Sequence, residues 1–341
     1  MAGKNFKYPY EFSDHALKKY FLLIGERQGF LRLEKKNLVT AISGGGDSVA
    51  LLWLFKKFYD GEIIAAHVNH KIRGQDSDLD AEFVRELAFS WNIKFYECAV
   101  NVLDEKFSGE SLETAARRIR YRELERIALE NNSSGILLGH NRDDLAETVL
   151  FNLFRGSGIR GAVGIPETNS IGDIKIFRPL IDLRRNFLRE LLRVRGISWR
   201  EDNSNLDTAY TRNFIRLELL PLIENKINSR VIDHVADFAK DITDFRAFDE
   251  ERGHELLRAV MLDSDDENIL RLDRKKLRTF KARDINLIIR ELGRNLNIKT
   301  LSRDRLNELT GLIIKNDRFI FQWCGCFTIE GTGGFITCKK F

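Results

Sequence analysis

Three consecutive glycines stand between hydroxyl and carboxylate side chains in the segment Ser43-Gly-Gly-Gly-Asp47-Ser48. A β-branched apolar run precedes this segment, and an apolar run of helical length follows it. A strand, a glycine loop and a helix can together bind an anion, because glycine lets the backbone approach closely and the first N–H groups of the helix point at the anion. The loop is neither a Walker A motif, since no lysine follows its glycines, nor a G-x-G-x-x-G fingerprint. It therefore predicts a phosphate site of another kind, with a plain tight turn as the alternative.

A second group of reactive residues occupies the segment "GHNRDDLAET", at positions 139–148. If a helix begins here, Asp143 and Glu147 are four residues apart, and Asp144 and Glu147 are three apart. Carboxylates at these spacings share one helix face. The alternative is an acidic first turn that stabilises the helix through its dipole.

Two histidines, His67 and His70, follow the second apolar run of strand length. Zinc needs further cysteine, histidine or carboxylate ligands, and none lies nearby at a matching spacing, so a metal centre of this type is disfavoured. Cys324, Cys326 and Cys338 have apolar neighbours, which favours buried strand cysteines over metal ligands.

The elements that must position these residues alternate between strand-like and helix-like segments. Strands are predicted at 37–43, 62–70, 93–100 and 135–140, each followed by a helical pattern. This order predicts an α/β fold with a doubly wound, Rossmann-like parallel sheet. Ligands bind at the carboxyl ends of strands in such sheets, so we expect the polar clusters to meet at one edge.

The character of the sequence changes near residue 217. Helical patterns follow at 229–260, 281–295 and 301–313, and the last segment, 318–341, alternates around glycine turns like a β-meander. We therefore predict a catalytic domain at 1–217 and a helical domain at 218–341 that ends in a short β-meander.

Composition limits the class of protein. The chain has 341 residues, 43% apolar and 31% charged, as in ordinary globular proteins. No run of about 18 apolar residues occurs, so no membrane-spanning helix is expected. The start of the chain lacks the apolar stretch of a secretory signal, and the four cysteines are few, so we expect a cytoplasmic location. Residues 184–230 include ten basic and six acidic residues, an excess that becomes informative only beside other signs of nucleic acid.

The pattern S-G-G-x-D-S resembles the PP-loop of the N-type ATP pyrophosphatases, which split ATP between its α and β phosphates and adenylylate a carbonyl oxygen. The resemblance implies ATP as cosubstrate and Mg²⁺ as cofactor, with Asp47 as the metal ligand. It also assigns His67 to the nucleotide site. The residues expected to hold the departing pyrophosphate are Ser43, Gly44, Gly45, Gly46 and Ser48.

The other segments, taken in order, resemble the tRNA(Ile)-lysidine synthetases within that superfamily. The order is H-x-N-H-x-x-R, A-R-x-x-R-Y, G-H-x-x-D-D-x-x-E-T, RPL, WREDNSN and R-N-F-I-R, across about residues 35–222. The resemblance implies a two-step reaction. ATP adenylylates the C2 oxygen of the wobble cytidine in an isoleucine tRNA with a CAU anticodon, and free L-lysine then displaces AMP to give lysidine. The tRNA then reads AUA instead of AUG and accepts isoleucine instead of methionine.

The resemblance also implies roles for the residues around this reaction. Asp144 and Glu147 are expected to bind the amino groups of lysine, and one of them to remove a proton. Arg117 is expected to contact the lysine carboxylate or the adenylate phosphate. His140 is expected near the reaction centre.

Three further arginines are expected to contact the tRNA. Arg155, beside glycines, suits a loop that closes over a flipped-out cytosine. Arg212 and Arg216 fall in the R-N-x-x-R motif and suit backbone contacts. The family often has a second histidine where this chain has Asn141, and the C-terminal region is short, which leaves acceptor-stem recognition open.

Two alternatives and the assembly stay open at this point. A PP-loop tRNA thiolase activates a base in a similar way, but such enzymes generally need several cysteines, and the predicted catalytic domain has only Cys98. A non-catalytic RNA-binding protein is the other alternative. The expected partners are the isoleucine tRNA and free L-lysine, and a homodimer is possible.

Overall fold

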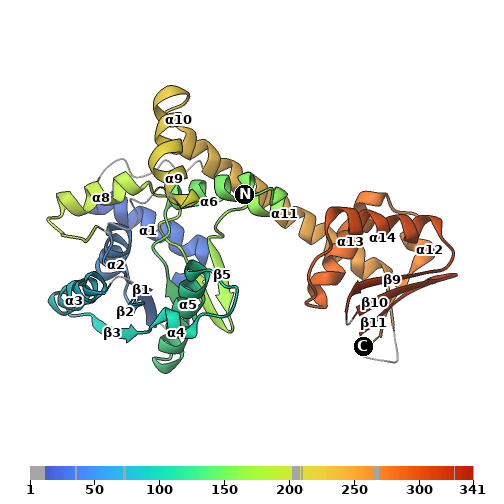
Figure 1. Cartoon of the computed structure of the whole chain (residues 1–341), viewed down its shortest axis with the longest axis horizontal. Helices are drawn as coiled ribbons and strands as arrows, with labels where there is room; N and C mark the ends of the chain where they lie inside the picture. The colour runs from blue at the N-terminus through green and yellow to red at the C-terminus, as the bar shows by residue number, and fades with distance from the viewer. Residues whose placement is uncertain are drawn as a thin grey trace. The chain divides into compact units, whose positions relative to one another are not determined.

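The computed structural model describes residues 12–34, 37–71, 74–201, 208, 210–263, 269–325 and 327–340. The chain forms two compact units, Met1–Lys240 and Asp241–Phe341 (Figure 1). Their division lies further along the chain than the boundary predicted at 217–218. That boundary stays a prediction, because compactness alone does not establish which part of a chain folds independently.

The first unit contains a six-stranded sheet with the order β3-β2-β1-β4-β6-β5 (Figure 1). Four of its strands are the predicted ones, namely β1 (Asn37–Ala41), β2 (Glu62–Asn69), β3 (Lys94–Ala99) and β4 (Gly135–Leu137). These four strands run parallel to one another. The α/β fold with a parallel sheet is therefore confirmed.

Two short strands at one edge of this sheet were not predicted. β6 (Ile174–Phe177) pairs in parallel with β4, and β5 (Thr168–Ile171) pairs antiparallel with β6. Each has four residues, and β5 is mostly exposed, so no apolar run marks it in the sequence.

Helices cover both faces of the sheet. The helices of the first unit are α1 (Asp14–Gln28), α2 (Gly46–Phe58), α3 (Gln75–Ser90), α4 (Val102–Glu105), α5 (Leu112–Glu130), α6 (Arg142–Phe154), α7 (Gly158–Ala162), α8 (Arg185–Val194), α9 (Thr211–Phe214) and α10 (Leu220–Lys226). Successive strand residues point to opposite faces. Leu38 accordingly packs with α1, α2 and α8, while its neighbour Val39 packs with α5. In the part of the chain that the structure describes, no helix combines the length and the apolar character needed to cross a membrane.

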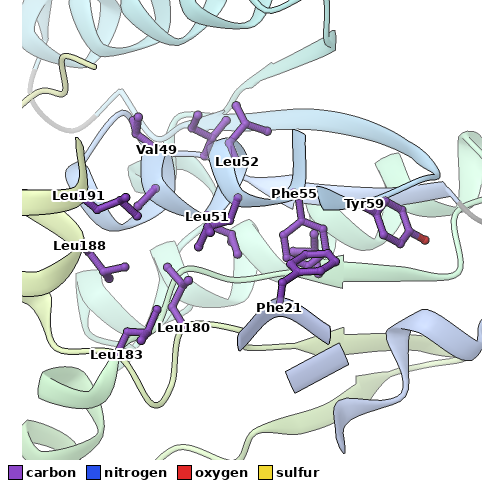
Figure 2. Close-up of a cluster of buried hydrophobic side chains, with 14 of the residues drawn as sticks. Phe21, Val49, Leu51, Leu52, Phe55, Tyr59, Leu180, Leu183, Leu188 and Leu191 are labelled. Carbon is purple, nitrogen blue, oxygen red and sulfur yellow. The ribbon is translucent and has the colours of Figure 1, made fainter. Parts of the chain in front are cut away.

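The largest cluster of buried apolar side chains in the first unit fixes α8, the helix that follows β5 and β6 along the chain. Leu188 and Leu191 of α8 lie on the side of Leu51 of α2 (Figure 2). One turn further along α2, Phe55 packs against Phe21 of α1, with ring centroids 5.0 Å apart. Burying a leucine or phenylalanine side chain stabilises a fold by about 1.5–3 kcal/mol. This packing holds the first turn of α8 near the first turn of α2, where the glycine loop ends.

The second unit combines helices with a five-stranded antiparallel sheet of order β7-β8-β11-β10-β9. The division between the units falls within α11 (Val231–Val260). The remaining elements are β7 (Met261–Leu262), β8 (Ile269–Asp273), α12 (Arg274–Leu277), α13 (Ala282–Asn295), α14 (Arg303–Lys315), β9 (Phe319–Cys324), β10 (Phe327–Thr332) and β11 (Phe335–Lys340). The predicted helices and the terminal meander are confirmed, and β7 and β8 extend the meander.

One buried arginine organises the second unit. Arg274 is fully buried, and its guanidinium donates to the backbone oxygens of Ile313, 3.2 Å away, and Asp317, 2.6 Å away. These carbonyls lie at and just beyond the end of α14, where helices leave carbonyl groups without intrahelical partners.

Candidate active site

The glycine loop between β1 and α2 is closed by its own serines. The backbone N–H of Ser43 donates to Oγ of Ser48 at 3.2 Å, and that hydroxyl donates to the carbonyl of Gly45 at 2.8 Å. Gly44 has φ of 90°, a conformation that favours glycine. The N–H of Arg200 donates to the carbonyl of Gly44 at 2.9 Å. The first N–H groups of α2 have no intrahelical partners, so they remain available to an anion.

Asp47 brings a carboxylate to the first turn of α2. Its Oδ1 atom is buried and has no hydrogen-bond partner among the described residues, and its Oδ2 atom lies 3.8 Å from Nε of Arg185. Burial, with repulsion from Asp144, raises the pKa of Asp47 to about 7, against the opposing effect of Arg185. An unpartnered carboxylate oxygen beside a phosphate-type loop suits a hard cation such as Mg²⁺. No group of three or more possible ligands from His, Cys, Asp and Glu occurs among the described residues. A cation here would therefore depend on phosphate oxygens and water for its other ligands.

The carboxylates of α6 are positioned by the cap of that helix. Asn141 accepts a hydrogen bond from the N–H of Asp144 at 2.9 Å, and Oδ2 of Asp144 accepts one from the N–H of Asn141 at 3.0 Å. This reciprocal capping box fixes the start of the helix. The predicted helix is confirmed, and Asn141 acts as its cap.

Arg185 joins the two predicted carboxylates. Its Nη2 atom donates to Oδ1 of Asp144 at 2.7 Å and to Oε1 of Glu147 at 2.9 Å, and its backbone N–H donates to Asp143 at 2.8 Å. Arg184 also binds Asp143, with Nε to Oδ2 at 3.1 Å. The cluster is therefore a network of carboxylates and arginines, in which each charge has a partner.

Burial and this arginine set the protonation of the carboxylates. Burial raises the pKa of Glu147, as does Asp144, while Arg185 opposes both. Burial also acts to raise the pKa of Asp144, but Arg185 and His140 outweigh it, and the net pKa is lowered. Of the two carboxylates, Glu147 is thus the one that accepts a proton more readily.

The two arginines of the R-N-x-x-R motif face Glu147. Nε of Arg212 lies 3.6 Å from Oε2 of Glu147, and Nε of Arg216 lies 3.9 Å from Oε1. Arg212 also donates to Oγ1 of Thr148 at 3.2 Å. Arg216 sits on a π-helical segment, Ile215–Leu219, a feature that often marks functional sites.

The site histidines lie at the ends of β2 and β4. Nδ1 of His67 donates to the carbonyl of Ile42 at 2.8 Å. Nδ1 of His140 accepts from Nε of Arg178 at 3.1 Å, and burial lowers the pKa of His140 to about 3. Nδ1 of His70 is buried without a hydrogen-bond partner among the described residues.

Two cavities adjoin the loop. The first, of about 470 Å³, has charged walls that include Glu147, Arg184, Arg185 and Arg216. The second, of about 660 Å³, has a largely apolar wall with His67, His70 and His140. The apolar residues of its wall include Ala41, Ile42, Ala66, Val68, Leu124 and Leu138. Residues that line both cavities are Ser43, Asp47, Ser48 and Asp80. The loop is therefore a common wall between a charged chamber and a more apolar one.

A family model described as a PP-loop domain matches residues 16–223, more than half of the chain. The chain belongs to the PP-loop family. The matched range ends within α10 and so includes the sheet, the loop and the carboxylate cluster.

Proteins named tRNA(Ile)-lysidine synthase resemble this PP-loop chain. One from Clostridioides difficile is 38% identical over 211 residues, 60% of this chain and 45% of its own length. One from Thermus thermophilus is 44% identical over 202 residues, 59% of this chain and 38% of its own length. The match thus spans less than half of each relative.

A solved structure shares the fold. The U34-tRNA thiolase NcsA from Methanococcus maripaludis, with its 4Fe-4S cluster, aligns with a TM-score of 0.55 over 67% of this chain and 80% of that chain. At 16% identity this similarity shows the PP-loop fold alone.

The predicted site residues divide into those that line a cavity and those that do not. Asp47, His140, Glu147 and Arg216 all line one or both cavities next to the PP-loop. Arg117 is exposed on α5, where it stacks on Tyr121 at 4.9 Å. Arg155, also exposed, caps the far end of α6 and packs on the ring of Phe151 at 5.1 Å. Neither of these two arginines is among the described residues that line the cavities.

Sequence reasoning missed three residues of the PP-loop site. Arg178 and Arg185 lie at the two ends of the segment "RPLIDLRR", and Asp80 lines both cavities from α3. The RPL motif marks this segment, but only the folded chain shows which carboxylate or histidine each arginine contacts.

Proposed function

We propose that this chain ligates L-lysine to C2 of the wobble cytidine of an isoleucine tRNA with a CAU anticodon. The reaction uses ATP, passes through an adenylylated cytidine, and gives lysidine, AMP and pyrophosphate. The observation that carries the proposal is the shared wall: the PP-loop and the carboxylates of α6 line one cavity. The lysidine synthases that the chain resembles support the choice among PP-loop reactions.

The phosphates of ATP are assigned to the PP-loop. The pyrophosphate would accept hydrogen bonds from the hydroxyls of Ser43 and Ser48 and from N–H groups at the start of α2, where the helix dipole favours an anion. Asp47 would hold Mg²⁺ through its unpartnered oxygen. When bound, Mg²⁺ neutralises charge on the departing pyrophosphate. The apolar wall of the 660 Å³ cavity suits the adenosine, with His67 and His70 beside it.

The carboxylates are assigned to lysine. An ammonium group entering the 470 Å³ cavity meets Glu147, together with Asp144 next to it on α6. It must share or replace the guanidinium of Arg185, which now contacts both carboxylates. In the second step the ε-amine forms a bond to C2 of the cytidine while the bond from C2 to the adenylate oxygen breaks and AMP leaves. The ammonium proton goes to Glu147, whose pKa is raised by burial and which is therefore the better base.

Binding of the tRNA is assigned to Arg155, Arg212 and Arg216 and to the second unit. Arg212 and Arg216 are charged groups beside the carboxylates, and Arg155 is exposed on the same helix as Glu147. The cytidine must leave the base stack to reach any of them. Because the chain spans less than half of the lysidine synthases it matches, tRNA binding by residues 218–341 is part of the proposal.

Transfer of labelled lysine tests the whole proposal. Purified protein would be incubated with radiolabelled lysine and a transcript of isoleucine tRNA with a CAU anticodon, with and without ATP. We expect ATP-dependent label in this tRNA and none in the initiator methionine tRNA, which shares the anticodon. A Glu147→Gln variant is the matched control, and we expect it to transfer less labelled lysine because it lacks the carboxylate assigned to lysine. Absence of label with an intact, folded protein contradicts the proposal.

The two rival functions give other results in the same assay. A thiolase would release AMP only with a sulfur donor in place of lysine, and a binding protein would release none. The single cysteine of the first unit is poorly suited to carry sulfur, because burial raises the pKa of the Cys98 thiol and its Sγ donates to Glu123 at 3.3 Å.

A further inference from the structure

Arg178 is a buried arginine whose side chain reaches a histidine of the site. It follows β6, is 2% exposed, and its Nε donates to Nδ1 of His140 at 3.1 Å. Its Nη1 donates to the carbonyl of Pro166 at 2.8 Å and to Oδ1 of Asn169 at 2.7 Å. The guanidinium is therefore bound on two sides besides the one that faces the histidine.

The backbone of Arg178 is fixed as firmly as its side chain. Gln28, the last residue of α1, accepts from the N–H of Arg178 at 3.1 Å and donates to its carbonyl at 3.0 Å. Gln28 is itself buried. Turning the side chain of Arg178 away from His140 would break its hydrogen bonds to Pro166 and Asn169 in a buried region, where unmade bonds are costly.

This contact decides which nitrogen of His140 carries the proton. A guanidinium has only N–H donors and no acceptor, so Nδ1 of His140 must be the acceptor and cannot be protonated. Burial lowers the pKa of His140 to about 3, with Arg178, Arg120 and Arg117 acting in the same direction and Asp144 against it. The ring is therefore neutral at pH 7, and its one proton is on Nε2.

We propose that Arg178 is a positioning residue that holds His140 in its Nε2-protonated form, so that His140 donates a hydrogen bond to a phosphoryl oxygen of the bound nucleotide. His140 lines the same cavity as Ser43, Asp47 and Ser48, the residues assigned to the phosphates. The identity of the acceptor rests on the proposed function. The tautomer does not, because it follows from the contact with Arg178.

This assignment separates two roles in the site. A histidine that presents N–H to the cavity cannot take the proton of an attacking amine at that atom. The proton from lysine would then go to another group, in agreement with Glu147 as the proposed base. His140 acts instead as a neutral donor beside the phosphates.

Nitrogen NMR of histidine tests the tautomer directly. The chain has six histidines, so protein labelled with ¹⁵N-histidine gives few signals, and the spectrum of a His140→Gln variant identifies those of His140. We expect a protonated Nε2 and a bare Nδ1 at pH 7, and a mixture of tautomers in Arg178→Met. A protonated Nδ1 in the unmodified protein, or an unchanged His140 signal in Arg178→Met, overturns the proposal.

Addition of ATP with Mg²⁺ tests the acceptor. We expect the Nε2 signal of His140 to move on nucleotide binding while Nδ1 stays unprotonated. A His140 signal that stays in place when bound ATP moves other histidine signals overturns the assignment to the nucleotide.

Kinetics separate positioning from a merely structural role. Arg178→Met should lower kcat for ATP-dependent AMP formation by about tenfold, the loss of one hydrogen bond, with little change in KM for ATP. The matched control is Arg118→Met on α5, which removes hydrogen bonds to the carbonyl of Glu105 at 2.8 Å and to Glu110 at 2.9 Å and lines neither of the two cavities. It should lower stability and leave kcat unchanged. Equal loss of kcat in both variants would mean that Arg178 only stabilises the fold, and contradicts the proposal.

The test distinguishes this inference from the proposed function. If lysine is not transferred but His140 carries its proton on Nε2 and responds to ATP, the proposed function fails and the inference stands. If lysine is transferred and Nδ1 carries the proton, the inference alone fails.

Discussion

Nη2 of Arg185 lies 2.9 Å from Oε1 of Glu147, a carboxylate that is only 2% exposed. The same nitrogen also binds Asp144 at 2.7 Å. A buried carboxylate without a countercharge is costly, so this arginine makes the burial of both acids possible. Its guanidinium also occupies the position where an ammonium group would bind these two carboxylates.

Removing Arg185 should destabilise the protein strongly. Arg185→Met leaves two buried carboxylates with weaker partners, and we expect a loss of about 3 kcal/mol in the free energy of unfolding, measured by urea denaturation. Arg193→Met on the same helix is the control, because its exposed pair with Glu190 contributes less than about 1 kcal/mol. Adding Glu147→Gln to Arg185→Met should restore part of the loss. Equal stability of the two arginine variants would contradict this account.

Asp47 should make stability fall as pH rises. Its pKa is about 7 in the folded protein against an ordinary 3.8, so the folded form binds the proton more tightly than the unfolded form. The stabilisation is complete below pH 4 and is lost between pH 4 and pH 7, at roughly 1.4 kcal/mol for each unit of pKa shift. Asp47→Asn cannot ionise and should not show this loss.

Thermal unfolding from pH 4 to pH 8 measures the difference between the two proteins. Relative to the unmodified protein, Asp47→Asn should gain stability across this range. Asp144→Asn is the control, because the pKa of Asp144 is lowered and its contribution is lost only below about pH 4, so its difference from the unmodified protein should stay constant across this range. A difference between Asp47→Asn and the unmodified protein that does not change with pH would refute the assignment.

The carboxylates of α6 should govern lysine more than ATP. Glu147→Gln removes a charge that faces the proposed ammonium site, so we expect KM for lysine to rise by tenfold or more, about 1.4 kcal/mol, while KM for ATP changes less. Steady-state AMP formation with each substrate varied in turn measures both. Asp47→Asn should show the reverse pattern, with AMP formation lost at any lysine concentration. Parallel increases in both KM values for Glu147→Gln would count against the lysine assignment.

The cap of α6 should contribute separately to stability. Asn141→Ala removes the side-chain oxygen that accepts from the N–H of Asp144, and such caps are typically worth about 1 kcal/mol. Asn141→Ser keeps a capping oxygen and should recover most of that loss in urea denaturation. If Ala and Ser variants unfold at the same urea concentration, the cap is not what stabilises this helix start.

Local patterns predicted the parts of the site that depend on neighbouring residues. The apolar run before Ser43 and the glycines after it set a strand, a loop and a helix within a few residues of one another. The spacing of Asp144 and Glu147 placed them on one helix face. The cap is equally local, because an asparagine followed three residues later by an aspartate can form a capping box. It was not predicted, since Asn141 was interpreted only as a departure from the histidine that the family often has at that position.

Contacts between distant segments were beyond such reasoning. Arg185 is 38 residues from Glu147, and Arg178 is 38 residues from His140. Each pairing depends on how α8 and the C-terminal end of β6 pack against the start of α6. No periodic pattern in the sequence predicts that packing. The same limit applies to β5 and β6, whose four residues each are too short for an alternation to be recognised.

The loop that separates the two cavities would also keep the two small substrates of the proposed reaction apart. A partition of Ser43, Asp47, Ser48 and Asp80 gives the molecule two chambers with one wall in common. Under the proposed function, a small charged substrate would occupy one chamber while the nucleotide stays bound in the other, and the transfer would take place at their common wall.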